Sequence, residues 1–289
     1  MVDDIKIGVI GGSGLYDMPD ITDKEALDMD TPFGKPSAPL MVGTLHGKRV
    51  AFVPRHGDGH IYDPTHVPYR ANLYALKMLG VRFVISVSAC GSLQEQYEPG
   101  HIVMADQLYD NTRHRSSTFF GSGIAAHTPV ADPFDPYLRG VLLESVQESG
   151  GMAHDGGLFI TIEGPRYSTK GESRLYRSWG CDIIGMTTSP EAFLAAEAEI
   201  AYAVMAHITD YDVWHETEEA VSAISVAETA TRNVETIKAA LAVAIEKLDE
   251  NTLCPVHDNL AGAIVTAPEN LSDEVRTRLD AIIGRYLNA

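Results

Sequence analysis

The sequence predicts an α/β protein with a large mixed, partly barrel-like β-sheet flanked by helices. Two observations support this fold class. Short β-rich apolar runs alternate with amphipathic segments along the chain, and several of the runs end in glycine or hydroxyl residues. The length of 289 residues is enough to bury one large core, and the hydrophobic content of 45% and charged content of 21% are those of an ordinary globular protein.

Strands are predicted where β-branched and aromatic residues cluster between turn residues. Such runs are numerous enough for a large sheet that closes partly on itself. The predicted strands are Lys6–Ile10, Leu40–Leu45, Arg49–Pro54, Phe83–Val87, Ile102–Asp106, Leu158–Ile162, Asp182–Met186 and Tyr202–Thr209.

Helices are predicted between these strands at Tyr69–Leu79, Pro136–Glu148, Pro190–Glu199 and Glu228–Leu248. The second begins with Asp135 as N-cap and proline in its first turn, and it stops at Gly150–Gly151. The last has one apolar stripe, which we expect to pack on the sheet. The stripe consists of Val234, Ile237, Leu241, Ile245 and Leu248.

The chain divides into one main domain and a C-terminal extension. No internal repeat, low-complexity tract or linker occurs before Leu248, so residues 1–250 are interpreted as a single domain. Residues 251–289 are irregular at first and then predict a helix near Ser272–Leu287. We expect this extension to cover the active site or a neighbouring subunit.

The charge of the chain argues against some partners. Asp and Glu number 40 against 22 Lys and Arg, so the formal net charge is -18. A surface of this sign repels nucleic acid and anionic membranes, so we expect neither as a partner. An anionic small molecule would need a local pocket of Arg, His, hydroxyl and amide groups.

The cysteines and the N-terminal residues predict a cytoplasmic protein. Cys90, Cys181 and Cys254 are far apart and form no CxxC motif or metal-type cluster, as is typical of a reduced intracellular protein. The first residues lack the pattern of a signal peptide, and no apolar run of about 18 residues occurs.

Two acids, Asp210 and Asp212, follow the apolar stretch Tyr202–Ile208. On a strand, side chains at i and i+2 share one face, so both carboxylates point to one place. Desolvation and mutual repulsion raise the pKa of one of them, which gives a carboxylic acid able to donate a proton near neutral pH. Such a pair suits a basic heterocyclic nitrogen, and a solvated turn with two acids is the alternative.

The first strand ends in the glycine-rich turn Gly11–Leu15, where backbone amides can approach an anion and the Ser13 hydroxyl points inward. The spacing is not that of a dinucleotide site, because Asp17 stands where the last glycine of GxGxxG is required. No Gly-Lys-Ser/Thr follows, so it is not a Walker loop either. The alternative is an ordinary turn that ends the strand and binds no ligand.

Arg55 and His56 follow another strand and stand next to glycines. A guanidinium suits bidentate phosphate contacts, and an imidazole adds a further donor. His56 and His60 are four residues apart, but the glycines between them disfavour a helical metal site. The pair is interpreted as an oxyanion site, with a surface loop as the alternative.

Two more strand ends are rich in hydroxyls, at Ser88–Ser92 and at Met186–Ser189. The second precedes a helix N-terminus, where anions bind, and the carboxyl ends of strands are where open α/β sheets bind ligands. Cys90 is a candidate nucleophile only if a histidine base converges on it, and is otherwise a small buried residue.

The run Thr161–Thr169 carries three further candidates. Glu163 and Arg166 can form a structural ion pair, and Tyr167 can stack on a flat ligand. A phosphate site beside a site for a nitrogen heterocycle explains this run together with the strand ends above.

Taken together, these motifs resemble the methylthioadenosine phosphorylase branch of the trimeric purine nucleoside phosphorylase family. They occur in the family's order from about Ile5 to Leu248 and so cover most of the chain. The matching pieces are Gly11–Leu15, Thr31–Ser37, Arg55–Gly57, Ala89–Leu93, Thr161–Arg166, Met186–Thr188 and Thr209–Asp212.

The resemblance implies a purine nucleoside phosphorylase-like fold and a pentosyltransferase of purine and methionine salvage. Its reaction would be the reversible phosphorolysis of 5'-methylthioadenosine to adenine and 5-methylthioribose 1-phosphate. It would work as a homotrimer without metal or organic cofactor, and inorganic phosphate would be a co-substrate. The phosphate site implied by the motifs consists of Ser13, Arg55, His56, Ser88, Ala89 and Thr187.

The resemblance also implies a nucleoside site. Asp210 and Asp212 would be the catalytic pair that reads N7 and the exocyclic amine of adenine, with Tyr167 against the base and Met186 along the ribose. The remaining implied residues surround the 5'-substituent. They are Ala223 and Val226 in an apolar pocket, His127 from a neighbouring subunit, and Leu260 as a candidate from the C-terminal segment.

Two other functions stay open. A purine nucleoside phosphorylase for inosine, guanosine or methylthioinosine is disfavoured by Asp210 and Asp212, because asparagine in place of Asp212 would donate to a carbonyl oxygen of the base. A non-catalytic nucleoside-binding protein would bind its ligand without phosphate-dependent turnover.

Overall fold

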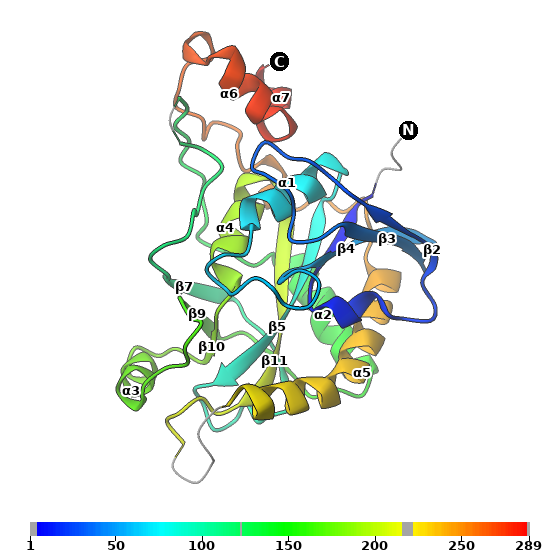
Figure 1. The fold of residues 1–289 in the computed structure, drawn as a ribbon, viewed down its shortest axis with the longest axis vertical. Helices are drawn as coiled ribbons and strands as arrows, with labels where there is room; N and C mark the ends of the chain where they lie inside the picture. Colours follow the sequence, from blue (N-terminus) through cyan, green and yellow to red (C-terminus); the bar gives the residue numbers. More distant parts are fainter. Residues whose placement is uncertain (1–4, 122, 216–221, 288–289) are drawn as a thin grey trace.

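An 11-stranded mixed sheet forms the centre of the molecule (Figure 1). The computed structural model describes residues 5–121, 123–215 and 222–287. One path through the sheet has the order β2-β3-β4-β1-β5-β10-β9-β7, while β11 pairs with β5 and β6, and β6 pairs with β8. The sheet therefore branches at β5, which pairs with β1, β10 and β11. The predicted fold class is confirmed.

The two longest strands, β5 and β11, have 10 residues each and pair with each other. The strands are β1 Ile7–Gly11, β2 Thr22–Leu27, β3 Leu40–Leu45, β4 Lys48–Pro54, β5 Phe83–Ser92, β6 Ile102–Met104, β7 Gln107–Asn111, β8 Ala153–Asp155, β9 Leu158–Ile162, β10 Ile183–Gly185 and β11 Ala201–Asp210.

The predicted strands are confirmed, and three others were missed. β3 and β9 match their predictions residue for residue, whereas β5 continues five residues beyond the predicted end at Val87. β2 was missed because its polar sequence TDKEAL is almost wholly exposed at the sheet edge and carries no apolar alternation. β7 and β8 likewise carry mostly polar residues.

Helices flank the sheet on both faces. They are α1 Tyr69–Met78, α2 Pro136–Glu148, α3 Lys170–Ser178, α4 Thr188–Glu197, α5 Ala223–Lys247, α6 Asp273–Arg278 and α7 Asp280–Leu287. The cap of α2 is as predicted, because the Asp135 side chain accepts from the Leu138 backbone N–H at 2.9 Å. The unpredicted α3 begins with a capping box formed by Thr169 and Glu172.

The central strands are buried on both faces, as strands of a largely parallel sheet are. Alternate residues of β11 face opposite cores: Ala203 and Met205 pack with α2 and α5, while Tyr202 and Val204 lie in the core of α1 and α4. Figure 1 shows these two helix pairs on either side of β5 and β11. The apolar stripe predicted for α5 is largely buried.

The C-terminal segment packs into the same core. Leu260, Leu279, Ile282 and Ile283 are buried with residues of α1, and α7 lies next to α1 (Figure 1). Within the chain, the extension therefore covers α1. The helix predicted near its end is interrupted at Leu279, between α6 and α7. Among the described residues, no helix is both long enough and apolar enough to cross a membrane.

Four parallel strands bring the predicted motifs to one edge of the sheet. β1 is parallel to β4 and β5, and β5 is parallel to β11, so their carboxyl ends lie together. β10 runs antiparallel to β5, with Ile184 opposite Gly91. Met186 and Thr187, which follow β10, therefore lie near the carboxyl end of β5.

Candidate active site

A cavity of about 840 Å³ lies at this edge of the sheet, between the strand ends and α5. It brings together most of the predicted site residues, which come from six segments far apart in the sequence. The predicted residues that line it are Arg55, His56, Ser88, Ala89, Tyr167, Met186, Thr187, Asp210, Asp212, Ala223 and Val226.

Three predicted residues are not among those that line the cavity. The Ser13 side chain lies outside the described part of the chain, although the backbone of Gly12 and Gly14 borders the cavity. His127 is exposed elsewhere on the same chain, where its backbone N–H donates to Ala263. Leu260 is buried in the hydrophobic core, so the structure gives it a packing role and no place in the cavity.

Asp210 ends β11 at one end of the cavity. Its Oδ2 accepts from the Thr209 hydroxyl at 2.7 Å, and its Oδ1 accepts from the Asp212 backbone N–H at 2.8 Å. Burial raises the pKa of Asp210 to about 6, and these two hydrogen bonds oppose the shift only in part. The charge of Asp212 adds a smaller increase, so desolvation is the main cause and repulsion between the acids is secondary.

Asp212 lies beside Asp210 in a turn. It has the left-handed dihedral φ of 49°, which aspartate tolerates better than most residues. Its pKa is raised, mainly by burial. The hydroxyls of Ser173 and Ser168 and the backbone N–H of Val213 lie close enough to oppose this increase in pKa. The buried Oδ2 of Asp212 nevertheless makes no well-aligned hydrogen bond within the described residues. The Trp214 indole donates to the carbonyl of Ser92 at 2.8 Å and so ties the turn to β5.

A β-bulge sets the position of Asp210. β5 and β11 pair in register up to Cys90 and Ile208, and the register then shifts so that Asp210 lies opposite Gly91. A Cβ atom at Gly91 would lie 2.9 Å from Asp210 Oδ1 and 3.0 Å from Ile184. Glycine is therefore required at position 91 for Asp210 to lie this close to β5.

Arg55 lies at the other end of the cavity and is only 3% exposed. Its guanidinium forms a two-pronged ion pair with Glu191 of α4, with Nε–Oε1 and Nη2–Oε2 distances of 2.8 and 2.9 Å. Glu191 also accepts from the Tyr202 hydroxyl and from Ser86. The pKa of Arg55 is raised because these interactions with Glu191 outweigh burial.

Other groups occupy most of the remaining Arg55 donors. Nη2 also contacts Ser86 Oγ and the carbonyl of Ile10, and Nη1 donates to the carbonyl of Val87 at 2.9 Å. Only one Nη1 N–H has no partner among the described residues. The bidentate contact with an anion that the sequence suggested is therefore not available to Arg55 in this arrangement.

His56 stands next to Arg55 with its ring held on two sides. Nδ1 lies 2.8 Å from the carbonyl of Tyr62, and the ring stacks on His60 with centroids 4.2 Å apart. Burial and the neighbouring Arg55 charge lower the pKa of His56 to about 4. The imidazole is therefore neutral near neutral pH. Because a carbonyl only accepts, Nδ1 carries the proton and Nε2 is an acceptor.

Ser88 and Thr187 complete this end of the cavity. Their hydroxyl oxygens are 3.4 Å apart, although they come from β5 and from the turn after β10. Thr187 stands at the N-cap of α4 but makes no side-chain capping bond, so its hydroxyl is free to turn toward the cavity. Two rotatable hydroxyls near a helix N-terminus can donate to an anion.

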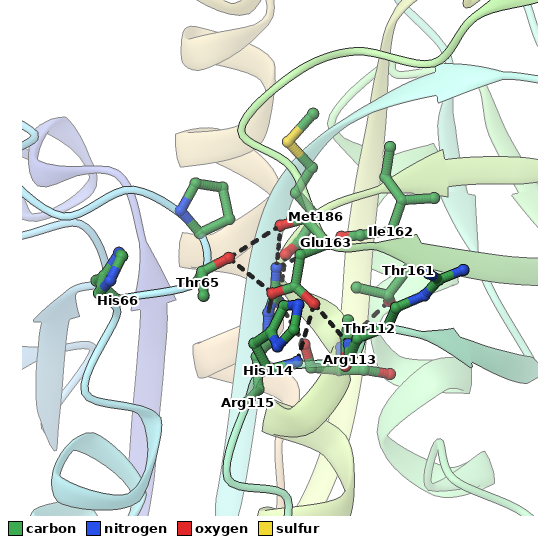
Figure 2. A network of polar contacts seen from close by, with 12 residues as sticks. Thr65, His66, Thr112, Arg113, His114, Arg115, Thr161, Ile162, Glu163 and Met186 are labelled. Carbon is green, nitrogen blue, oxygen red and sulfur yellow. Dashed lines mark hydrogen bonds and ion pairs between the residues drawn. The ribbon is translucent and has the colours of Figure 1, made fainter.

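A network of polar contacts supports the cavity wall behind Met186 (Figure 2). Arg115 is buried and donates through Nη1 to the carbonyls of Met186 and Ser189 at 2.6 and 2.7 Å. Its Nη2 donates to the carbonyl of Glu163 at 2.7 Å. The Glu163 carboxylate accepts from Thr65 Oγ1 and from the backbone N–H groups at positions 113 and 114.

This network corrects the ion pair predicted between Glu163 and Arg166. Glu163 pairs with Arg115, at an Nε–Oε1 distance of 3.3 Å, and Arg166 pairs with Glu172 on the surface. Thr65 and two backbone amides join Arg115 in lowering the pKa of Glu163 to about 2, against the opposing effect of burial. Glu163 is therefore an ionised structural group.

Sequence reasoning missed Glu191 and Arg115. Glu191 stands in the apolar run Pro190–Ala196, and a fully buried glutamate in such a run requires a cationic partner. That rule points to a buried arginine without saying which one. Arg115 follows no strand motif, so no local signal was available for it.

Other cavity residues are clear only in the structure. His60 stacks against His56, and Ala227 and Ala230 extend the wall that Ala223 and Val226 begin on α5. Cys90 lines the cavity, but burial raises the pKa of its thiol to about 12, so it is not a nucleophilic thiolate. Among the described residues, no cluster of His, Cys, Asp and Glu is arranged to hold a metal ion.

Comparison with known protein families gives a match over most of the chain. A family model described as the phosphorylase superfamily matches residues 6–246. S-methyl-5'-thioadenosine phosphorylase of Chloroflexus aurantiacus is 51% identical over 281 residues, which cover 97% of this chain and 98% of the relative. The protein of the same name from Geobacter sulfurreducens is 48% identical over 282 residues, covering 97% and 99%.

Solved structures resemble the fold closely. A methylthioadenosine phosphorylase from an Antarctic soil metagenomic library superposes with a TM-score of 0.93 at 44% identity, covering 97% of this chain and 99% of the other. Methylthioadenosine phosphorylase from Schistosoma mansoni, solved in complex with adenine, superposes with a TM-score of 0.84 at 34% identity, covering 90% and 99%.

Proposed function

This chain belongs to the phosphorylase superfamily, and from that premise we propose that it catalyses the reversible phosphorolysis of 5'-methylthioadenosine. The products are adenine and 5-methylthioribose 1-phosphate. The observation that carries the proposal is one cavity with two largely buried acids of raised pKa at one end and oxyanion donors at the other. Such a cavity can hold a purine and a phosphate on either side of a ribose.

Asp210 acts as the acid in this mechanism. As the glycosidic bond breaks, negative charge grows on the purine and positive charge grows on the sugar. A carboxyl group whose pKa is raised to about 6 can donate a hydrogen bond or a proton to N7 of the departing base. Bound phosphate stabilises the sugar cation and attacks it, so the enzyme needs no covalent intermediate.

Asp212 gives the preference for an aminopurine. Its buried Oδ2 makes no well-aligned hydrogen bond within the described residues, and an exocyclic amine can donate one. A 6-oxopurine such as hypoxanthine would place a second acceptor against it. The acid at position 212 thus favours adenine over the bases of inosine and guanosine, which are the alternative substrates.

The remaining roles follow from position. Tyr167 borders the cavity beside Asp210 and Asp212 and is placed to stack on the base. Met186 also lines the cavity and is assigned to the ribose. Ala223 and Val226, at the start of α5, form the apolar surface for the methylthio group.

The homotrimer implied by the family resemblance is part of this proposal. The cavity wall within the chain does not include His127, which is exposed and available to a neighbouring subunit. In a trimer, His127 of one subunit closes the 5'-end of the next subunit's cavity. The three cysteines are free and buried, which suits a reducing cytoplasm.

Phosphate dependence tests the proposed function. Purified protein should release adenine from 5'-methylthioadenosine only when phosphate is added, and should turn over methylthioinosine much more slowly. Adenine release that is independent of phosphate would indicate hydrolysis. Binding of the nucleoside without any release would leave only a binding protein.

A further inference from the structure

The charge of Arg55 is already cancelled inside the protein. Glu191 binds both Nε and Nη2 of the guanidinium, and both side chains are almost fully buried. An oxyanion bound in front of Arg55 therefore meets a neutral ion pair and at most one N–H of Nη1. Selection between oxyanions of equal charge must depend on the pattern of hydrogen-bond donors and acceptors around them.

His56 contributes an acceptor to that pattern. Its Nδ1 must carry a proton, because its partner 2.8 Å away is the Tyr62 carbonyl. The stacked ring of His60 and the adjacent guanidinium oppose a second proton on the imidazole. The nitrogen left for the cavity is Nε2, with a lone pair.

The neighbouring hydroxyls do not distinguish between anions. Ser88 and Thr187 can each rotate to donate to a bare oxygen or to accept from a protonated one. His56 has no such freedom, because rotation about its ring axis would break the contact with Tyr62. The acceptor at Nε2 is thus the fixed element in this end of the cavity.

We propose that the oxyanion site at this end of the cavity, formed by Arg55, His56, Ser88 and Thr187, selects oxyanions that carry a proton. The selection depends on the fixed hydrogen-bond acceptor Nε2 of His56. Hydrogen phosphate and hydrogen arsenate each present an O–H to this nitrogen near neutral pH. Sulfate and selenate have similar shapes and the same charge as the dianions but no proton, so they place an oxygen lone pair against it. The inference rests on the proposed function for the location of the phosphate.

The test measures anion binding to the full chain without nucleoside, so it does not depend on turnover. Dissociation constants for phosphate, arsenate, sulfate and selenate are determined by calorimetry near neutral pH. Phosphate and arsenate should bind at least about tenfold tighter than sulfate and selenate, since an unpaired buried acceptor is costly. Monofluorophosphate, which has no proton near neutral pH, should bind as weakly as sulfate.

The variant His56→Gln tests the assignment to Nε2. A glutamine amide can present either its oxygen or its NH₂ group, so the ratio of phosphate affinity to sulfate affinity should fall to about threefold or less. The matched control is His60→Gln, which changes the stacked ring but leaves the acceptor in place, and should keep the discrimination. Thermal melting verifies that both variants are folded.

The outcomes separate the two hypotheses. Sulfate or monofluorophosphate binding within about threefold of phosphate in the unmodified protein would overturn the selection mechanism while leaving the phosphorylase function intact. Discrimination that persists in His56→Gln would show that another group provides it. If none of the four anions binds and phosphate does not stimulate adenine release, the proposed function itself fails, and this inference fails with it.

Discussion

Glu163 and Asp210 are two carboxylates beside the same cavity whose pKa values shift in opposite directions. In both residues burial by itself raises the pKa, because it favours the neutral acid. Glu163 has an arginine, a hydroxyl and two backbone amides directed at it, and its pKa falls to about 2. Asp210 has one hydroxyl and one amide and no cation, and its pKa rises to about 6.

The difference shows how this fold assigns different roles to identical groups. A carboxylate with a full set of donors is fixed as an anion and holds loops together, as Glu163 does for the segments around Thr65, Arg115 and Met186. A carboxylate with few donors has a higher pKa, so both its protonated and its ionised forms are accessible near neutral pH. The shortage of donors, rather than burial alone, distinguishes the candidate catalytic acid from the structural one.

Asp210→Asn should have the largest effect. The amide cannot deliver a proton to the purine, so turnover of 5'-methylthioadenosine should fall by about 10²-fold or more. Steady-state kinetics at saturating phosphate measures it, with Asp17→Asn, a change outside the cavity, as the matched control. Near-normal turnover would remove Asp210 from the mechanism.

Glu163→Gln should mainly affect stability. The change removes the negative charge that pairs with Arg115 and accepts the backbone amides of residues 113 and 114, so the free energy of unfolding should fall by about 2 kcal/mol. Urea denaturation gives this value. Turnover at saturating substrate should fall less than about tenfold. A loss of turnover as large as that of Asp210→Asn, in a protein that remains folded, would contradict a purely structural role.

The two acids should also give opposite dependences of stability on pH. Glu163 has a folded pKa of about 2 against an ordinary value of 4.5, so its stabilisation is complete above 4.5 and is lost as the pH falls toward 2. Asp210 has a folded pKa of about 6 against 3.8, so ionisation destabilises the fold as the pH rises from 3.8 through 6.

Asp210→Asn removes that ionisation and should therefore stabilise the protein at neutral pH by about 1–3 kcal/mol. The gain should vanish at a pH below 3.8. Denaturation at several pH values measures the difference between the variant and the unmodified protein. A variant that is less stable at neutral pH would show that Asp210 is not destabilised by its surroundings.

Asp212→Asn should have the smallest effect, on the choice of base. An amide can donate to a 6-oxo group, so the ratio of kcat/KM for 5'-methylthioadenosine over methylthioinosine should fall by about tenfold. Competition between the two nucleosides in one reaction measures this ratio directly. No change in the ratio would mean that Asp212 does not contact the 6-position of the purine.

Local sequence signals predicted the frame of the fold. Alternating apolar residues located β3 and β9, and Asp135 with Pro136 located the start of α2. The acids at the end of β11 were recognised because two carboxylates after a buried strand are unusual. These features depend on neighbours in the sequence, so a single chain is enough to read them.

Long-range pairing was not readable in the same way. Arg55 and Glu191 are 136 residues apart, and nothing near either residue identifies the other. Arg55 was predicted to bind an anion through two donors, but most of its donors bind other residues of the protein. Likewise, Glu163 has a nearby arginine at position 166 but pairs with Arg115. Arg115 lies in the segment after β7, which is next to Glu163 because β7 pairs with β9.

The shifted register between β5 and β11 has a consequence for how such an enzyme diversifies. Ser88 and Gly91 lie on one strand, and Asp210 lies opposite Gly91 on the next. The distance between the proposed sites for the two reactants is therefore set by the paired main chains, and substitutions other than at Gly91 leave it unchanged. Other substitutions at either site can therefore change which molecule binds there without changing the distance between the two sites.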